Sequence, residues 1–128
     1  MKLQADRIEG VNVVTGLAPG KVTVNRVAYQ QSILIPWQGE VTPWGRPHFD
    51  ALGVADFQLL ADMNPELVIF GSGSCLRFPP PALLRPLIER AIGVETMDSA
   101  AACRTYNLLA SEGRRVVAAL LLEPASTP

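Results

Sequence analysis

Residues 66–74 read ELVIFGSGS, an uninterrupted apolar stretch followed at once by a turn of glycine and serine. A continuous apolar run of this length is typical of a strand buried on both faces of a parallel sheet. A helix follows and residues 94–97 form the next strand. The order strand–helix–strand predicts a right-handed crossover that makes the two strands parallel.

The helix between these strands begins at Pro81, because proline suits the first helical turn, and ends at Gly93, a residue type favoured just past a helix end. Its predicted buried stripe consists of Leu83, Leu84, Leu87, Ile88 and Ala91.

A second helix is predicted over residues 100–111, with Asp98 or Ser99 as its N-cap. The run RVVAALLL at residues 115–122 is the last strand and the most apolar stretch of the chain. The connection at residues 112–114 is short, so the direction of this strand stays open.

The first half is less regular. Residues 21–29 and 32–36 alternate or run apolar and are bounded by turn residues, which predicts an antiparallel pair or meander. A helix from Gly53 to Met63 has Val54, Phe57 and Ala61 on one face and is stopped by the proline at 65. We therefore predict a three-layer α/β fold. It has a mixed central sheet, parallel βαβ units and an N-terminal antiparallel β-meander, with residues 1–128 as a single domain.

Composition excludes several classes of protein. The chain has 128 residues, of which 48% are apolar and 18% charged, and its net charge of −1 gives no basic field for nucleic acid. Cys75 and Cys103 form no metal-binding pattern and predict no disulfide. The first ten residues lack the apolar segment of a signal peptide, and the longest apolar run, 116–122, is too short to span a bilayer. We expect a cytoplasmic protein.

Polar residues are predicted to gather at one edge of the sheet, where open α/β sheets bind ligands. The turn after the first parallel strand and the start of the second helix both lie at the carboxyl ends of strands. Arg104 and Asn107 of that helix are expected to reach back toward the edge, because helical side chains tilt toward the N-terminus. The candidate ligand or anion rim consists of Gly71, Ser72, Gly73, Ser74, Asp98, Ser99, Arg104 and Asn107.

Two interpretations of this rim stay open. Glycine amides, serine hydroxyls, a helix N-terminus and an arginine are suited to an anion. Alternatively, the glycines make a tight turn, and Arg104 pairs with Asp98 or Glu95. We favour the second interpretation, because the two carboxylates place negative charge nearby. The rim also lacks the third glycine of a dinucleotide fingerprint, since Leu76 stands in its place.

No complete catalytic set is visible. The chain lacks a phosphate-binding GxxxxGK[ST] loop and the GxSxG frame of a serine hydrolase. His48 is the one histidine that could serve as a base, and a pair of Cys75 with His48 is an alternative that we do not favour. We predict no enzyme activity, no metal and no cofactor.

The segments ELVIFGSGS, LLRPLIERAIGVETMDS and ACRTYNLLASEGRRVVAALL resemble one family pattern over residues 66–122. The family contains the mitochondrial complex I assembly factor 3 and the adipogenesis-associated domain-containing protein. The matching positions are Gly71 to Gly73, Gly93 to Ser99, Ala102, Thr105, Tyr106, Asn107, Leu109, Glu112 and Arg114. The resemblance implies a three-layer α/β fold and, for the mitochondrial member, assembly of respiratory complex I through protein contacts.

Two functions follow as hypotheses. The first is a non-enzymatic accessory or protein-interaction domain that helps assemble a larger complex, such as a respiratory complex, with an unidentified protein partner. Trp37 and Trp44, expected at the edge of the core and exposed, favour it. The alternative is a small-ligand or anion-binding domain that uses the Gly71–Ser74 rim. Association of the chain with itself in a homo-oligomer is also compatible with the sequence.

Overall fold

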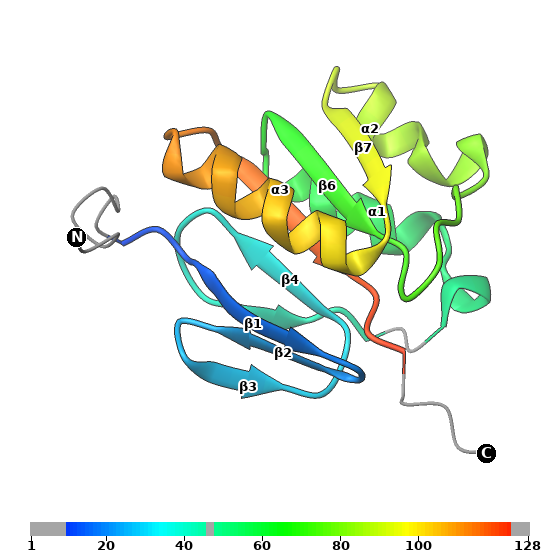
Figure 1. Cartoon of the computed structure of the whole chain (residues 1–128). Coiled ribbons are helices and arrows are strands. Elements are labelled where there is room, and N and C mark those ends of the chain that lie inside the picture. Colours follow the sequence, from blue (N-terminus) through cyan, green and yellow to red (C-terminus); the bar gives the residue numbers. More distant parts are fainter. Residues whose placement is uncertain (1–9, 46–47, 124–128) are drawn as a thin grey trace, which may run out of the picture.

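The structure is a computed structural model that describes residues 10–45 and 48–123 (Figure 1). The expectation for the first ten residues falls almost wholly outside these ranges. The structure confirms the predicted α/β class and has two sheets over these residues.

The central sheet has five strands, and its order mixes the two halves of the chain. From edge to edge it runs β5 (Thr42–Pro43), β4 (Ile33–Pro36), β8 (Val116–Leu120), β6 (Leu67–Gly71) and β7 (Gly93–Met97). β6 is parallel to both β7 and β8, so the predicted βαβ units are confirmed and the direction of the last strand is settled. β4 is antiparallel to β8 and β5, which makes the sheet mixed.

The second sheet is a three-stranded antiparallel meander of β1 (Val14–Ala18), β2 (Lys21–Val24) and β3 (Val27–Tyr29). The predicted pairing of residues 32–36 with this meander is wrong, because β4 pairs with β8 instead. All four β4 residues are buried, whereas β2 alternates between exposed and buried residues. A strand that is apolar on both sides needs a sheet covered on both faces.

Two of the predicted helices form where expected. α1 spans Val54–Asp62 and α3 spans Ser99–Ser111, with the Asp98 carboxylate accepting a hydrogen bond from the Ala101 amide as N-cap. Phe57 and Ala61 are buried, but Val54 is 47% exposed, because it begins α1 outside the core.

The helix predicted from Pro81 to Gly93 is shorter and less regular. It consists of a 3₁₀ turn, η3 (Pro81–Leu84), and one helical turn, α2 (Arg85–Ile88). Another 3₁₀ turn, η2 (Phe49–Ala51), lies earlier in the chain, just before α1. Ile88 and Ala91 are exposed rather than buried. The left-handed residue that ends the turn is Ala91, with φ of 57°, and Gly93 already belongs to β7.

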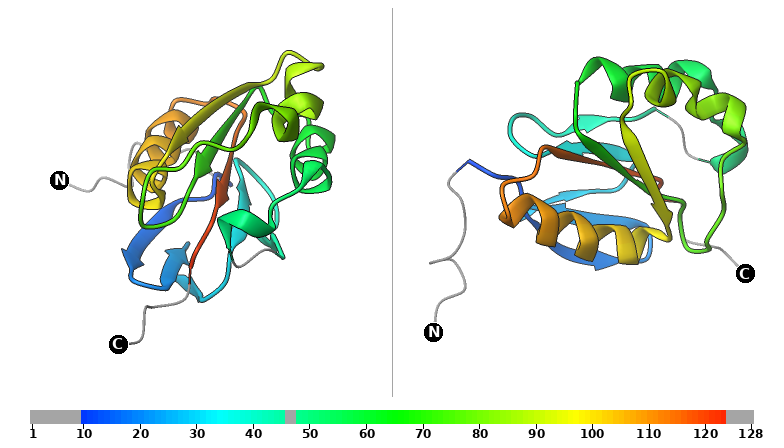
Figure 2. Two further views of the ribbon diagram at one scale, coloured as in Figure 1. Left: turned by 90° about the vertical axis from the view of Figure 1, so that its right-hand side faces the viewer. Right: turned by 90° about the horizontal axis from the view of Figure 1, so that it is seen from above.

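The central sheet separates two cores (Figure 2). On one face it is covered by α3 and by the three-stranded sheet, and on the other by α1 and α2. The first core is centred on Ile33, Ile35, Ile69, Ala118 and Leu120 of the sheet. The second contains Phe57, Leu60, Val68, Phe70 and Val117. The three predicted layers are therefore present, with a small sheet sharing one outer layer with α3.

The two tryptophans differ from the expectation of exposure. Trp44 is only 3% exposed, and its ring lies edge-on at 5.9 Å from the rings of both Phe57 and Phe70. Trp37 is half-buried against the same core. Trp44 therefore offers no aromatic contact for a partner, and Trp37 offers only a partly exposed one.

Candidate functional site

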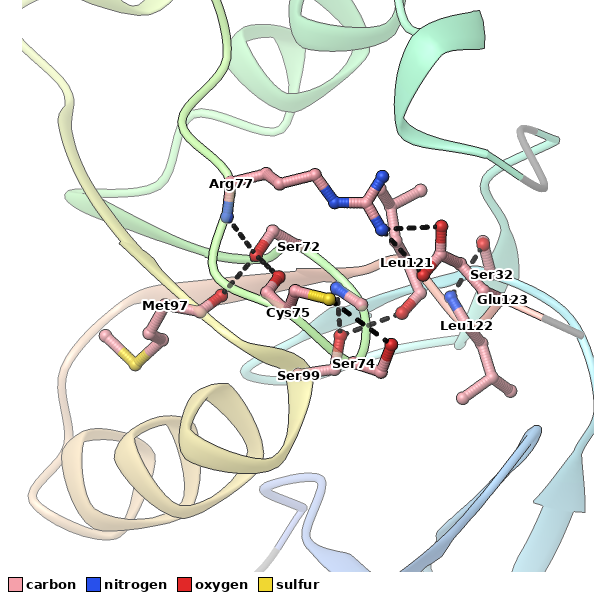
Figure 3. Close-up of polar contacts among 11 residues, drawn as sticks. Ser32, Ser72, Ser74, Cys75, Arg77, Met97, Ser99, Leu121, Leu122 and Glu123 are labelled. Atoms are coloured by element: carbon pink, nitrogen blue, oxygen red, sulfur yellow. Dashed lines mark hydrogen bonds and ion pairs between the residues drawn. The ribbon is translucent and has the colours of Figure 1, made fainter. Parts of the chain in front are cut away.

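The turn after β6 meets the N-terminus of α3 at one edge of the central sheet (Figure 3). The Gly73 amide donates to the Ser99 hydroxyl at 3.0 Å, and the Ser99 amide donates to the Gly73 carbonyl at 2.8 Å. The structure thus brings together six of the eight predicted rim residues, the Gly71–Ser74 turn with Asp98 and Ser99. This arrangement follows from β6 and β7 being parallel neighbours.

Close packing explains the two glycines of the turn. A Cβ on Gly71 would lie 2.9 Å from both Leu120 Cδ2 and Ser99 Oγ, and 3.0 Å from Ser99 Cα. Gly73 has φ of +98°, and a Cβ there would lie 2.6 Å from Glu123 Oε1. Only glycine fits both positions without a shift of its neighbours.

The two buried serine hydroxyls of the rim, Ser72 and Ser99, already bind backbone groups, whereas Ser74 is exposed and its hydroxyl contacts Cys75 Sγ at 3.8 Å. Ser72 is fully buried, and its Oγ lies 2.6 Å from the Cys75 carbonyl while accepting from the Arg77 amide at 3.0 Å. Ser99 accepts from Gly73 and donates to the Leu121 carbonyl at 2.8 Å. A hydroxyl has one hydrogen to donate, so neither serine has a free donor for a ligand.

The other two predicted rim residues do not join this cluster. Asn107 faces β1: its Oδ1 accepts from the Val14 amide and its Nδ2 donates to the Val14 carbonyl, both at 2.8 Å. Arg104 is exposed, and within residues 10–45 and 48–123 no ion pair joins it to Asp98 or Glu95. The predicted structural pairing of Arg104 is therefore wrong.

Asn107 belongs instead to a set of hydrogen bonds that attaches the three-stranded sheet to α3. Beside it, the Tyr106 hydroxyl lies 3.0 Å from the Asn12 carbonyl and 2.9 Å from the Pro36 carbonyl. The Asn12 side chain donates to the Pro36 carbonyl at 2.8 Å. Burial raises the pKa of Tyr106, so the phenol keeps its proton. The Tyr-Asn pair of the sequence motif is thus an architectural element.

Sequence reasoning missed Arg77 and Glu123, which lie 46 residues apart. The Arg77 guanidinium bonds both carboxylate oxygens of Glu123 at 2.9 Å and lies 5.4 Å from the centre of the Phe49 ring. Because the Arg77 amide also donates to Ser72 Oγ, Arg77 links Glu123, three residues after the end of β8, to the turn after β6. No local spacing rule connects such distant residues.

An open cleft of about 820 Å³ lies beside the rim. One wall is the end of β1 with the turn to β2, residues 17–20, and the other is formed by the rim and the residues after β8. His48, Asp98 and Glu123 also line it, but Arg104 does not. An anion in this cleft would meet two carboxylates, one of them paired with Arg77.

The cysteines lie where predicted. Cys75 is exposed in the rim loop, Cys103 is buried in α3, and both are free, which confirms that they are not bonded to each other. Burial raises the pKa of the Cys103 thiol to about 11, so this thiol stays protonated near neutral pH. Among the described residues, no group of three or more His, Cys, Asp or Glu side chains could hold a metal ion.

The same part of the chain contains no helix with the length and apolar character needed to cross a membrane.

Three comparisons place the chain among known proteins. A family model described as "Protein of unknown function (DUF498/DUF598)" matches residues 14–121. An uncharacterised protein of Rhodobacter capsulatus is 34% identical over 119 residues, covering 93% of this chain and 91% of that protein. A Bordetella pertussis protein described as a Mth938-like domain superposes with a TM-score of 0.84 at 31% identity, covering 98% of this chain and 95% of that one.

A third relative has a name that refers to a function. The bovine "NADH dehydrogenase [ubiquinone] 1 alpha subcomplex assembly factor 3" is 34% identical over 89 residues, or 68% of this chain. The match spans only 48% of the bovine protein. The resemblance inferred from the motifs of residues 66–122 is confirmed.

Proposed function

The chain belongs to the DUF498/DUF598 family, whose model matches residues 14–121, and we propose that it is a non-enzymatic accessory protein that helps assemble a larger protein complex, such as a respiratory complex. The observation that carries the proposal is the 34% identity to a protein named as an assembly factor for NADH dehydrogenase. Curated relatives from mouse and frog have the same name.

The rim supports a role without catalysis. Its glycines are explained by packing and its buried hydroxyls by backbone hydrogen bonds. Cys103, the buried thiol, is held in the protonated form and is a poor nucleophile. The two glycines of the turn and the buried hydroxyls of Ser72 and Ser99 therefore have structural tasks, which supports the proposal.

The direct test is deletion of the gene in the organism that encodes the chain. We expect less fully assembled NADH dehydrogenase on native gels, accumulation of its subcomplexes, and an unchanged ATP synthase as the control complex. A plasmid copy of the unmutated gene should restore assembly. Normal amounts of every respiratory complex in the deletion strain would contradict the proposal. Fractionation of the same cells tests the cytoplasmic location that we include in it.

The alternative function, binding of a small ligand, is favoured by one observation, the open cleft of about 820 Å³ beside the rim. Its lining includes the apolar side chains of Leu17, Leu121 and Leu122 together with His48. Ligand-observed NMR with a fragment library would detect such binding. Fragments whose signals respond to His48→Ala but not to an exposed control, Leu108→Ala, would support this alternative over the accessory role.

A further inference from the structure

In the part of the chain that the structure describes, the two sheets have four outer strands, and three of them have features that prevent further pairing. β5 has only two residues and ends at Pro43, and β3 has only three residues. β1 has a β-bulge between Val14 and Gly16, and the Asn107 amide binds both backbone groups of Val14. Short strands, proline and bulges are the means by which natural sheets prevent unwanted strand addition.

β7 is the fourth outer strand and has none of these features. Its five residues contain no proline and pair with β6 in unbroken parallel register. The Met97 carbonyl accepts from the Ser72 amide, so Met97 and Glu95 direct their backbone groups toward β6. Backbone groups alternate in direction along a strand, so those of Val94 and Thr96 point outward. Within the described ranges no strand lies beyond them.

The charge on this strand selects among possible partners. Glu95 is exposed, is the one charged residue of the sequence GVETM, and forms no ion pair with a described residue. Directly opposite residues on paired strands have Cβ atoms about 5 Å apart, so a basic residue there is favourable and an acidic one is not. A second copy of β7 centred on the same residue would place two Glu95 carboxylates opposite each other, which disfavours self-pairing.

We propose that the outer edge of β7 binds an extended segment of a partner protein as an added strand, with a Lys or Arg of that segment opposite Glu95. This inference rests on the proposed accessory function and assigns the surface that contacts the partner. The outward N–H and C=O groups of Val94 and Thr96 supply the main-chain hydrogen bonds, and Glu95 supplies the preference for a basic sequence.

The test uses the full chain and a phage-displayed library of random linear peptides as the probe. We expect enriched peptides in which β-branched and polar residues alternate around one Lys or Arg. Thr96→Pro should weaken their binding about tenfold or more, because proline removes an outward N–H without disturbing the bonds to β6. Thr96→Val keeps that N–H and is the matched control, with unchanged binding expected.

A second variant does not depend on how well Thr96→Pro folds. Glu95→Arg should reverse the preference from basic to acidic peptides, and thermal unfolding should confirm that each variant keeps the fold. Failure to enrich a common sequence, or equal binding by Thr96→Pro and Thr96→Val, would overturn the inference. So would a self-association, seen by sedimentation, that Thr96→Pro abolishes, because the occupant would then be a second copy. Deletion of the gene tests the accessory function independently of any peptide result.

Discussion

β8 and β1 both pack against α3, but they contact it through different kinds of side chain. Val116, Ala118 and Leu120 of β8 present apolar surface to the buried face of α3. β1 packs Val14 into the same apolar core, but it is also held by the Asn107 amide on the backbone of Val14. Apolar packing tolerates many combinations of side chains, whereas a two-bond amide contact requires one residue type in one orientation. The parallel half should therefore tolerate conservative substitutions, and the attachment of the small sheet through Asn107 should not.

The largest effect is expected within β8. Val117→Asp places an unpaired carboxylate between α1 and the sheet, at a side chain that is fully buried, and should cost several kcal/mol. That is comparable to the whole stability of a protein of this size, so the protein should unfold. Circular dichroism checks this, with Leu108→Asp on the exposed face of α3 as the control. A folded Val117→Asp variant with an unchanged thermal midpoint would show that apolar burial at this position of β8 is not needed for stability.

Gly73→Ala tests how tightly the end of the parallel half is packed. The left-handed φ costs roughly 1–2 kcal/mol for alanine, and the new Cβ also displaces the Glu123 carboxylate from its place beside Arg77. We expect a total loss of about 2–3 kcal/mol in denaturant unfolding. Gly39→Ala is the matched control, since Gly39 has φ of +102° with nothing within 4 Å of its Cβ position. Equal losses in both variants would mean that contact with Glu123 contributes nothing.

Asn107→Ala should separate the two regions. It removes two hydrogen bonds to Val14 and should lower the free energy of unfolding by about 1–2 kcal/mol, since water replaces part of the loss at this half-buried site. Hydrogen exchange should accelerate in β1 and β2 but stay unchanged in β6 and β8, while Leu108→Ala should change neither. Uniform acceleration over both sheets would show that they unfold as one unit.

The difference between the regions also explains which features the sequence could predict. β6, β7 and α3 follow from apolar runs and a cap residue, both of which act within a few residues. The partner of β4 could not be predicted, because a four-residue apolar strand fits any covered sheet. The rim turn was placed correctly, but Asn107 was assigned to it, because helical spacing alone cannot show that its amide binds β1.

Arg104→Ala should have the smallest effect of all. Arg104 is exposed and forms no ion pair with a described residue, and surface substitutions of this kind usually change stability by no more than about 0.5 kcal/mol. Asp98→Ala, which removes the N-cap bond to Ala101, should by contrast cost about 1 kcal/mol.

An anion held at the rim would raise the thermal midpoint as its concentration increases, because it would bind only the folded state. We expect no such rise in phosphate at matched ionic strength, in either the original protein or Arg104→Ala, because the cleft is lined by Asp98 and Glu123 and not by Arg104. A phosphate-dependent rise that only the original protein shows would assign the anion site to Arg104 and remove the rim from the list of purely architectural elements.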